Sequence, residues 1–128
     1  MVKEDYVNEE IMKLLLEKGY PLDKVVVQDF RTIWYTKDYN DPQWQDCDAY
    51  YIPTQSQVLK WLREVHKIII TIDFDEYELE SQGKKVGYGY NLQLESNPTE
   101  YEKISNLAYD TYEKAVEEGI SYSLINLI

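Results

Sequence analysis

The sequence predicts an α+β fold, with an antiparallel sheet of three to four strands and three helices packed mainly on one face of it. Two observations lead to this prediction. Apolar residues recur with the helical period of 3.6 in three separated segments, at residues 9–18, 55–65 and 111–127. They alternate with a period of two at residues 68–74 and 86–94, which is typical of strands with one buried face.

Composition limits the class of protein and its partners. The chain has 128 residues, which fits one domain over residues 1–128. Its net charge is −11, and its 13 lysines and arginines form no cluster larger than a pair, which argues against direct nucleic-acid binding. No apolar run is long enough for a signal peptide or a membrane span. A single cysteine, Cys47, fits a reducing compartment, so we expect a cytoplasmic protein.

The first segment is expected to be a short helix. Asn8 is a predicted N-cap, because its side-chain oxygen can accept a hydrogen bond from a free main-chain N–H of the first turn. Two glutamates follow it and suit the positive end of the helix dipole. Gly19 and Pro21 then end the helix, which we place at residues 9–18.

The next segment leaves two interpretations open. Residues 25–27 and 32–35 are both strand-like, but residues 28–31 between them contain no glycine or asparagine to mark a turn. A hairpin and one long bent strand therefore compete. Residues 37–48 are rich in aspartate and asparagine and are expected to form a loop.

The central helix leads directly into the first strand of the sheet. Thr54 and Gln57 have the spacing of a capping box, which places the start of the helix at Gln55. Its apolar stripe contains Val58, Trp61, Leu62 and Val65. After a short connection at residues 66 and 67, one strand face contains Ile68, Ile70, Ile72 and Phe74.

The second strand, residues 86–94, follows a predicted turn at residues 81–85 and pairs with the first as a meander. One of its faces contains Val86, Tyr88, Tyr90, Leu92 and Leu94, and we expect this face to meet the helices.

The final helix is expected to begin at Asp110 as N-cap, with Glu113 in its first turn. Gly119 lies within its apolar stripe. Because a glycine inside a helix costs about 1 kcal/mol relative to alanine, we expect a strand to approach the helix closely there.

These residues carry a resemblance to a known group of proteins. The order of elements resembles small acidic proteins that recur in gut Bacteroidales, their phages and their mobile elements. The residues that carry it are Pro53, Thr54, Gln57, residues 61–64, residues 109–113, Ala115, Gly119 and Ile120. The group has no established activity, so the resemblance implies a fold and a genomic setting without implying a reaction.

A second resemblance concerns residues 110–115, which are similar to the helix that follows the sheet in small HicB-type antitoxins. The proline- and glycine-marked strand end of that group is missing here. This resemblance implies an antitoxin-like or nuclease-inhibiting module as an alternative function.

The chemistry-bearing residues do not form a recognisable catalytic set, so we expect no enzyme, no cofactor and no metal centre. A dyad of Cys47 and His66 would need two distant positions to meet. Asp73 and Asp75 share one strand face and could hold a divalent cation, which keeps a small metal-dependent hydrolase as a further alternative. A solvated strand end that discourages edge pairing explains these acids equally well.

The predicted site is the sheet face opposite the helices. Glycine inside a strand is unfavourable unless something approaches closely. The expected protein-binding face consists of Thr71, Asp73, Gly87, Gly89 and Asn91. The approaching object is a protein partner, which the acidity suggests is basic, a second copy in a homodimer, or residues 37–48 of the same chain.

Tyrosine usage supports binding as the leading interpretation. The chain has 13 tyrosines and 2 phenylalanines, and tyrosine is enriched at interfaces. A recognition patch could include Tyr35, Tyr39, Tyr50, Tyr51 and Tyr77, whereas the alternative is that tyrosines cover a thin core. We therefore expect a non-enzymatic accessory protein of a phage or mobile element that acts by protein–protein binding.

Overall fold

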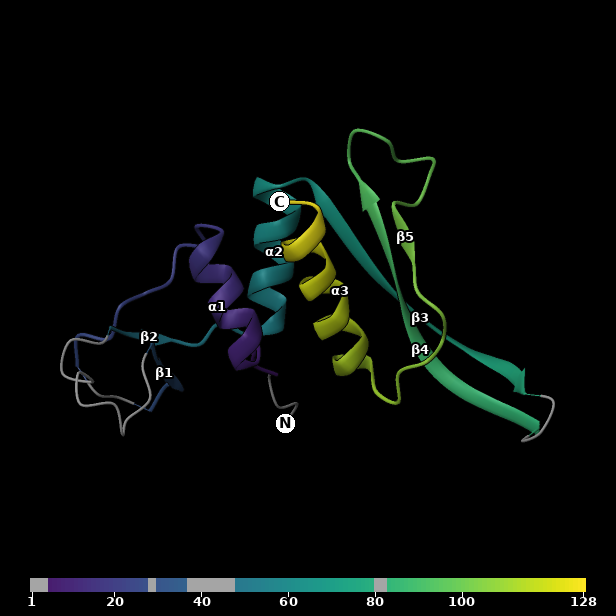
Figure 1. Ribbon diagram of the computed structural model, residues 1–128, viewed down its shortest axis with the longest axis horizontal. Helices are drawn as coiled ribbons and strands as arrows, with labels where there is room; N and C mark the ends of the chain where they lie inside the picture. The colour runs from purple at the N-terminus through teal and green to yellow at the C-terminus, as the bar shows by residue number, and fades with distance from the viewer. Residues whose placement is uncertain (1–4, 28–29, 37–47, 80–82) are drawn as a thin grey trace.

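The computed structural model describes residues 5–27, 30–36, 48–79 and 83–128, without the side chains of residues 77–79, 84 and 85 (Figure 1). The helices and strands follow one another as α1 (Glu9–Glu17), β1 (Ile33–Tyr35), β2 (Ala49–Tyr51), α2 (Gln55–Val65), β3 (Ile68–Leu79), β4 (Gly83–Leu94), β5 (Lys103–Ile104) and α3 (Tyr112–Asn126). The predicted α+β class is therefore confirmed.

Two antiparallel sheets lie at opposite ends of a layer of three helices (Figure 1). One is the small pair β1–β2, and the other has the strand order β3–β4–β5. α3 packs on β3 and β4, α2 packs against α3 and β3, and α1 packs against α3. The predicted arrangement is matched only roughly, because α2 and α3 pack on the three-stranded sheet, α1 packs on α3, and the second sheet was not predicted.

The caps of the first two helices match the sequence prediction. The Asn8 side chain accepts a hydrogen bond of 2.8 Å from the Ile11 N–H at the start of α1. Thr54 and Gln57 form the capping box of α2, with each side chain bonding to the main chain of the other residue. Both helices therefore begin where local sequence alone specifies.

The cap of α3 differs from the prediction by one residue. Thr111, and not Asp110, is the N-cap, and its hydroxyl accepts a hydrogen bond of 3.1 Å from the Lys114 N–H. Both residue types can cap a helix, so local sequence did not decide between them. Gly119 behaves as predicted, because a Cβ atom there would lie 3.1 Å from Cγ2 of Ile70 on β3.

Neither interpretation of residues 25–35 is correct. β2 lies between them: Trp34 of β1 pairs with Tyr50 on one side, and Lys24 pairs with Tyr50 on the other. The Val25 N–H donates to the Ala49 carbonyl at 2.9 Å, which holds this second side. A strand of three residues is too short to show an alternation, so β2 was not recognised in the sequence.

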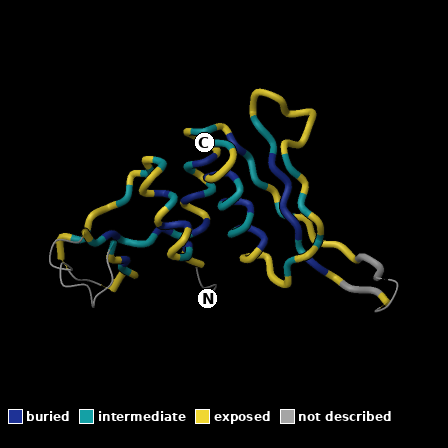
Figure 2. Tube along the Cα trace, in the orientation of Figure 1, coloured by how far each residue is buried: buried dark blue, intermediate teal, exposed yellow. Residues whose placement is uncertain are grey.

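The core passes through all three helices and reaches both sheets (Figure 2). It includes Leu15 of α1, Leu62 of α2 and Ile120 of α3, with Leu92 on β4 and Trp34 on β1. The stripe predicted for α2 is only partly buried: Val58 and Leu62 are inside, Trp61 is half-buried, and Val65 is 59% exposed. Among the described residues, no helix combines the length and the apolar character needed to cross a membrane.

Candidate protein-binding site

The hairpin of β3 and β4 extends past the beginning of α3 (Figure 1). Each strand has 12 residues, whereas α3 has 15. A strand rises about 3.3 Å per residue and a helix only 1.5 Å, so the strands measure about 40 Å and the helix about 22 Å. One helix therefore cannot cover the hairpin. We call its projecting part, residues 74–79 and 83–88, the outer arm.

The two faces of the hairpin follow from its register. Phe74 pairs with Tyr88 and Ile72 pairs with Tyr90, and these side chains lie on the helix side. Asp73 pairs with Gly89 and lies on the opposite side. The alternation predicted from sequence is therefore present along both strands.

All five residues of the predicted binding face lie side by side on the face away from the helices. Thr71 is opposite Asn91, Asp73 is opposite Gly89, and Gly87 follows on β4. Thr71 and Asp73 are exposed, but Asn91 is only 6% exposed, and its Nδ2 donates a hydrogen bond to the Asp73 carboxylate. The structure brings the predicted residues together, with the polar groups of two of them bonded to each other.

The chain itself covers this face at Gly89. A Cβ atom on Gly89 would lie 3.0 Å from the main-chain oxygen of Asn106 and 3.1 Å from Oγ of Ser105. Residues 103–109 run along the outer side of β4, where Ile104 pairs with Asn91 and Tyr109 pairs with Tyr88.

This covering segment is a bulge with two extra residues. Five steps of chain separate Ile104 from Tyr109, against three steps from Asn91 to Tyr88, so two residues are extra. The approaching object at Gly89 is therefore residues 105–107, which the sequence analysis did not consider. Residues 37–48, which it did consider, lie outside the described residues except for Asp48.

The outer arm carries an apolar patch on its helix side. Phe74 and Val86 are each 58% exposed, and Tyr112, at the start of α3, is 48% exposed. The rings of Phe74 and Tyr88 lie 4.7 Å apart, and the Tyr88 ring meets the Tyr112 ring edge-on at 6.4 Å. We call Phe74, Val86, Tyr88 and Tyr112 the arm patch. Sequence reasoning assigned these strand positions to the core because it did not compare strand length with helix length.

The arm patch continues into a group of three tyrosines, of which Tyr90 is buried and Tyr109 and Tyr122 are half-buried. The Tyr90 ring stacks on Tyr109 at 6.2 Å and approaches Tyr122 at 6.4 Å. Burial raises the pKa of the Tyr90 hydroxyl above its ordinary value, and the neighbouring Tyr109, Glu118 and Tyr122 raise it further. Burial likewise raises the pKa of Tyr109. We call Tyr90, Tyr109 and Tyr122 the tyrosine base of the arm patch.

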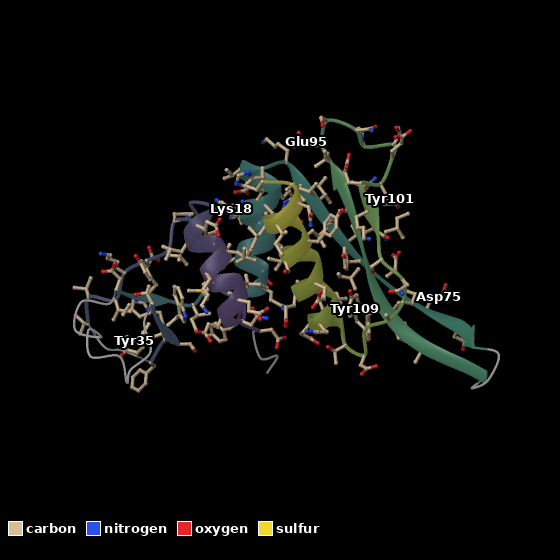
Figure 3. All side chains as sticks on the ribbon, in the orientation of Figure 1. Lys18, Tyr35, Asp75, Glu95, Tyr101 and Tyr109 are labelled. Atoms are coloured by element: carbon tan, nitrogen blue, oxygen red, sulfur yellow. The ribbon has the colours of Figure 1, made fainter. Side chains whose placement is uncertain are left out.

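Exposed acidic residues of β3 lie on both faces of the hairpin near the arm patch. Asp73 and Asp75 are exposed on the face away from the helices, and Glu76 is exposed beside Val86 in the pairing register. Asp75 lies on the part of the hairpin beyond the start of α3 (Figure 3). An exposed apolar surface next to carboxylates is therefore the main chemical feature of the outer arm.

Two of the five tyrosines suggested for a recognition patch have partners within the fold. Tyr50 is buried and stacks on Trp34 at 6.2 Å. The Tyr51 hydroxyl donates to the Val27 carbonyl at 2.8 Å, and the Arg31 guanidinium lies 3.5 Å from the centre of its ring. Tyr39 and the side chain of Tyr77 lie outside the described residues. Tyr50 and Tyr51 are thus used within the fold.

The sequence also suggested a Cys47–His66 dyad and a cation site at Asp73 and Asp75 as candidates. Cys47 is outside the described residues, and His66 packs edge-on against Trp61 with ring centres 4.5 Å apart. Within the described ranges, no group of three histidine, cysteine, aspartate or glutamate side chains is arranged to hold a metal ion. Among the described residues, Asp73 and Asp75 therefore share one strand face without a third side chain placed to complete a metal site.

Comparison of the chain with protein-family models, with curated proteins and with solved structures found no match. The resemblances stated from the sequence remain predictions.

Proposed function

We propose that this chain acts by binding another protein through the outer arm, as a non-enzymatic accessory protein of a phage or mobile element. The observation that carries the proposal is the arm patch, in which Phe74, Val86 and Tyr112 are about half exposed. Phe74 and Tyr112 each meet the Tyr88 ring, and Val86 lies two residues before Tyr88 on the same face of β4. A contiguous exposed apolar surface, especially one bordered by polar residues, is typical of a protein-interaction site.

The energetics favour a partner at this place. Full burial of a phenylalanine or valine side chain contributes about 1.5 to 3 kcal/mol, and the patch still exposes more than half of Phe74 and of Val86. A partner that fills the patch would therefore gain free energy by burying this apolar surface.

Charge indicates the kind of partner. The protein has a net charge of −11, and three acids of β3 are exposed near the patch: Glu76 opposite Val86, and Asp73 and Asp75 on the other face of the same strand. Opposite charges accelerate encounter and exclude wrongly charged partners. A partner surface that is apolar at its centre and basic at its rim fits this site.

Site-specific photocrosslinking in cells of the encoding organism tests the proposal. A photoreactive amino acid at Val86 should give a discrete adduct with one protein. The same amino acid at Val65 is the matched control, because Val65 is also a valine and is 59% exposed on α2. The purified adduct protein should then bind Val86→Asp at least about tenfold more weakly than the original chain, with Val65→Asp unchanged.

Two results would overturn the proposal. One is the absence of any adduct from Val86. The other is the same set of adducts from Val86 and Val65, which would indicate nonspecific contact.

A further inference from the structure

The outer edge of β3 carries main-chain groups whose direction can be derived from β4. The N–H of Tyr88 donates to the Tyr109 carbonyl at 2.9 Å, and the Tyr88 carbonyl accepts from the Tyr109 N–H at 3.1 Å. The Tyr90 carbonyl accepts from the Ser105 N–H at 2.9 Å. The even-numbered residues of β4 therefore direct their main-chain groups toward residues 102–109. Because successive residues point to opposite sides, the odd-numbered residues of β4 bond to β3.

The same alternation shows which main-chain N–H and carbonyl groups of β3 point away from β4. The odd residues of β4 pair with Thr71, Asp73 and Asp75, whose N–H and carbonyl groups are therefore used inside the hairpin. Those of Ile70, Ile72 and Phe74 point away from β4. β3 is an edge strand of its sheet, and within the described residues these outward groups have no main-chain partner.

The outward run ends at a defined point. The N–H of Glu76 donates to the Asp75 carboxylate at 2.7 Å, so this outward donor already has a partner. The open stretch is therefore residues 70–74, which adjoins the arm patch through Phe74. An unpaired edge of this kind is a template for an added strand.

The side chains on the two faces of this edge differ in chemistry. On the helix side, Ile72 is half-buried and Phe74 is exposed. On the other side, Thr71, Asp73 and Asp75 are all exposed. A strand added beside β3 would place alternate residues next to apolar side chains and next to carboxylates.

We propose that the free edge of β3 accepts an extended segment of the partner protein whose residues alternate between basic and apolar. The basic side chains lie beside Asp73 and Asp75, and the apolar ones lie beside Phe74 on the arm patch. This inference rests on the proposed function and specifies how the partner is recognised.

Charge argues against a second copy as the occupant. Pairing of two β3 edges would bring the Asp73 and Asp75 carboxylates of both copies together on one face. Like charges directly opposite each other destabilise a strand pair. The acids therefore oppose self-pairing and favour a basic segment.

Synthetic peptides provide the test. The probe is a peptide of about nine residues that alternates lysine and valine, and its control has the same composition with all lysines in one half. Calorimetric titration at low salt should show binding of the alternating peptide at least about tenfold tighter than binding of the control. Equal affinities would reduce the interaction to nonspecific charge attraction and overturn the proposal.

Amide hydrogen exchange of the protein reads the pairing directly. On saturation with the alternating peptide, the amides of Ile72 and Phe74 should become protected at least about tenfold. Those of Thr71 and Asp73 should exchange slowly both before and after, because they already bond to β4. Protection of both sets together, or of neither, would contradict strand addition.

A pair of variants separates the main chain from the side chain. Phe74→Pro removes the ring and the outward N–H, whereas Phe74→Thr removes the ring and keeps the N–H. Strand addition requires Phe74→Pro to bind the alternating peptide at least about tenfold more weakly than Phe74→Thr. Circular dichroism of both variants verifies that the hairpin is intact.

The same variants distinguish failure of this inference from failure of the proposed function. If the protein crosslinked at Val86 binds Phe74→Pro and Phe74→Thr equally, the arm is a binding site but strand addition is wrong. If Val86 yields no adduct and the alternating peptide does not bind, both proposals are wrong.

Discussion

The inner and outer halves of the β3–β4 hairpin have the same alternation and one continuous register, yet only the inner half belongs to the core. Ile68 and Leu92 on the inner half are buried, whereas Phe74 and Val86 on the outer half are each 58% exposed. All four side chains share the helix side of the sheet. Strand pattern thus determines which face a residue occupies, and the length of the covering helix determines whether that face is buried.

One side-chain truncation in each half of the hairpin tests this difference in burial most sharply. Leu92→Ala should lower the free energy of unfolding by about 2 to 5 kcal/mol, because it leaves a cavity where no solvent reaches. Val86→Ala, on the same strand and the same face, should change it by no more than about 0.5 kcal/mol. Urea denaturation of both variants measures the difference, and equal losses would mean that the outer arm is also core.

The face of the hairpin away from the helices allows a second test, with a smaller expected loss of stability. Gly89→Ala places a methyl group 3.0 Å from the Asn106 main-chain oxygen, so the bulge at residues 105–107 must shift. We expect a loss of about 1 to 3 kcal/mol in stability, as for other overpacked sites. Thr71→Ala is the control, because Thr71 lies on the same face but is exposed. A neutral Gly89→Ala would show that residues 105–107 do not press on β4.

Helices were predictable because their signals are local. Residues 55–65 match α2 in full, since the capping box and the apolar stripe both lie within the segment. The predicted helix 111–127 became α3 with a change of one residue at each end, because two adjacent residues could each cap it. Gly119 was also interpreted correctly, as a place where β3 and β4 approach the helix.

Short strands were not predictable, because their pairing depends on distant residues. β2 and β5 have three and two residues, which cannot display a period of two. The five residues of the predicted binding face do lie together, since register follows from alternation. Gly89 is covered because the bulge at residues 105–107 contains two extra residues. Phe74 is exposed because of where α3 lies along the hairpin (Figure 1). Neither can be deduced within a single segment.

Alkaline titration of Tyr90 has the smallest expected effect. It tests whether the inner half of the hairpin, which contains Tyr90, excludes water. Burial, followed by the charges of neighbouring groups, raises the pKa of Tyr90 above its ordinary value of 10.0. A group whose pKa is raised by folding contributes its full stabilisation below the unfolded pKa and loses it as the pH rises through the folded pKa.

The melting temperature should therefore fall as the pH rises above about 10, where the unfolded chain releases this proton before the folded one does. Tyr90→Phe should make this fall shallower, because it removes the hydroxyl that resists ionisation in the fold. The control is Tyr101→Phe, which removes a hydroxyl from a ring that is half exposed. If both variants leave the alkaline profile unchanged, the Tyr90 hydroxyl is as well solvated in the fold as in the unfolded chain, and the tyrosine base of the arm patch is open to water.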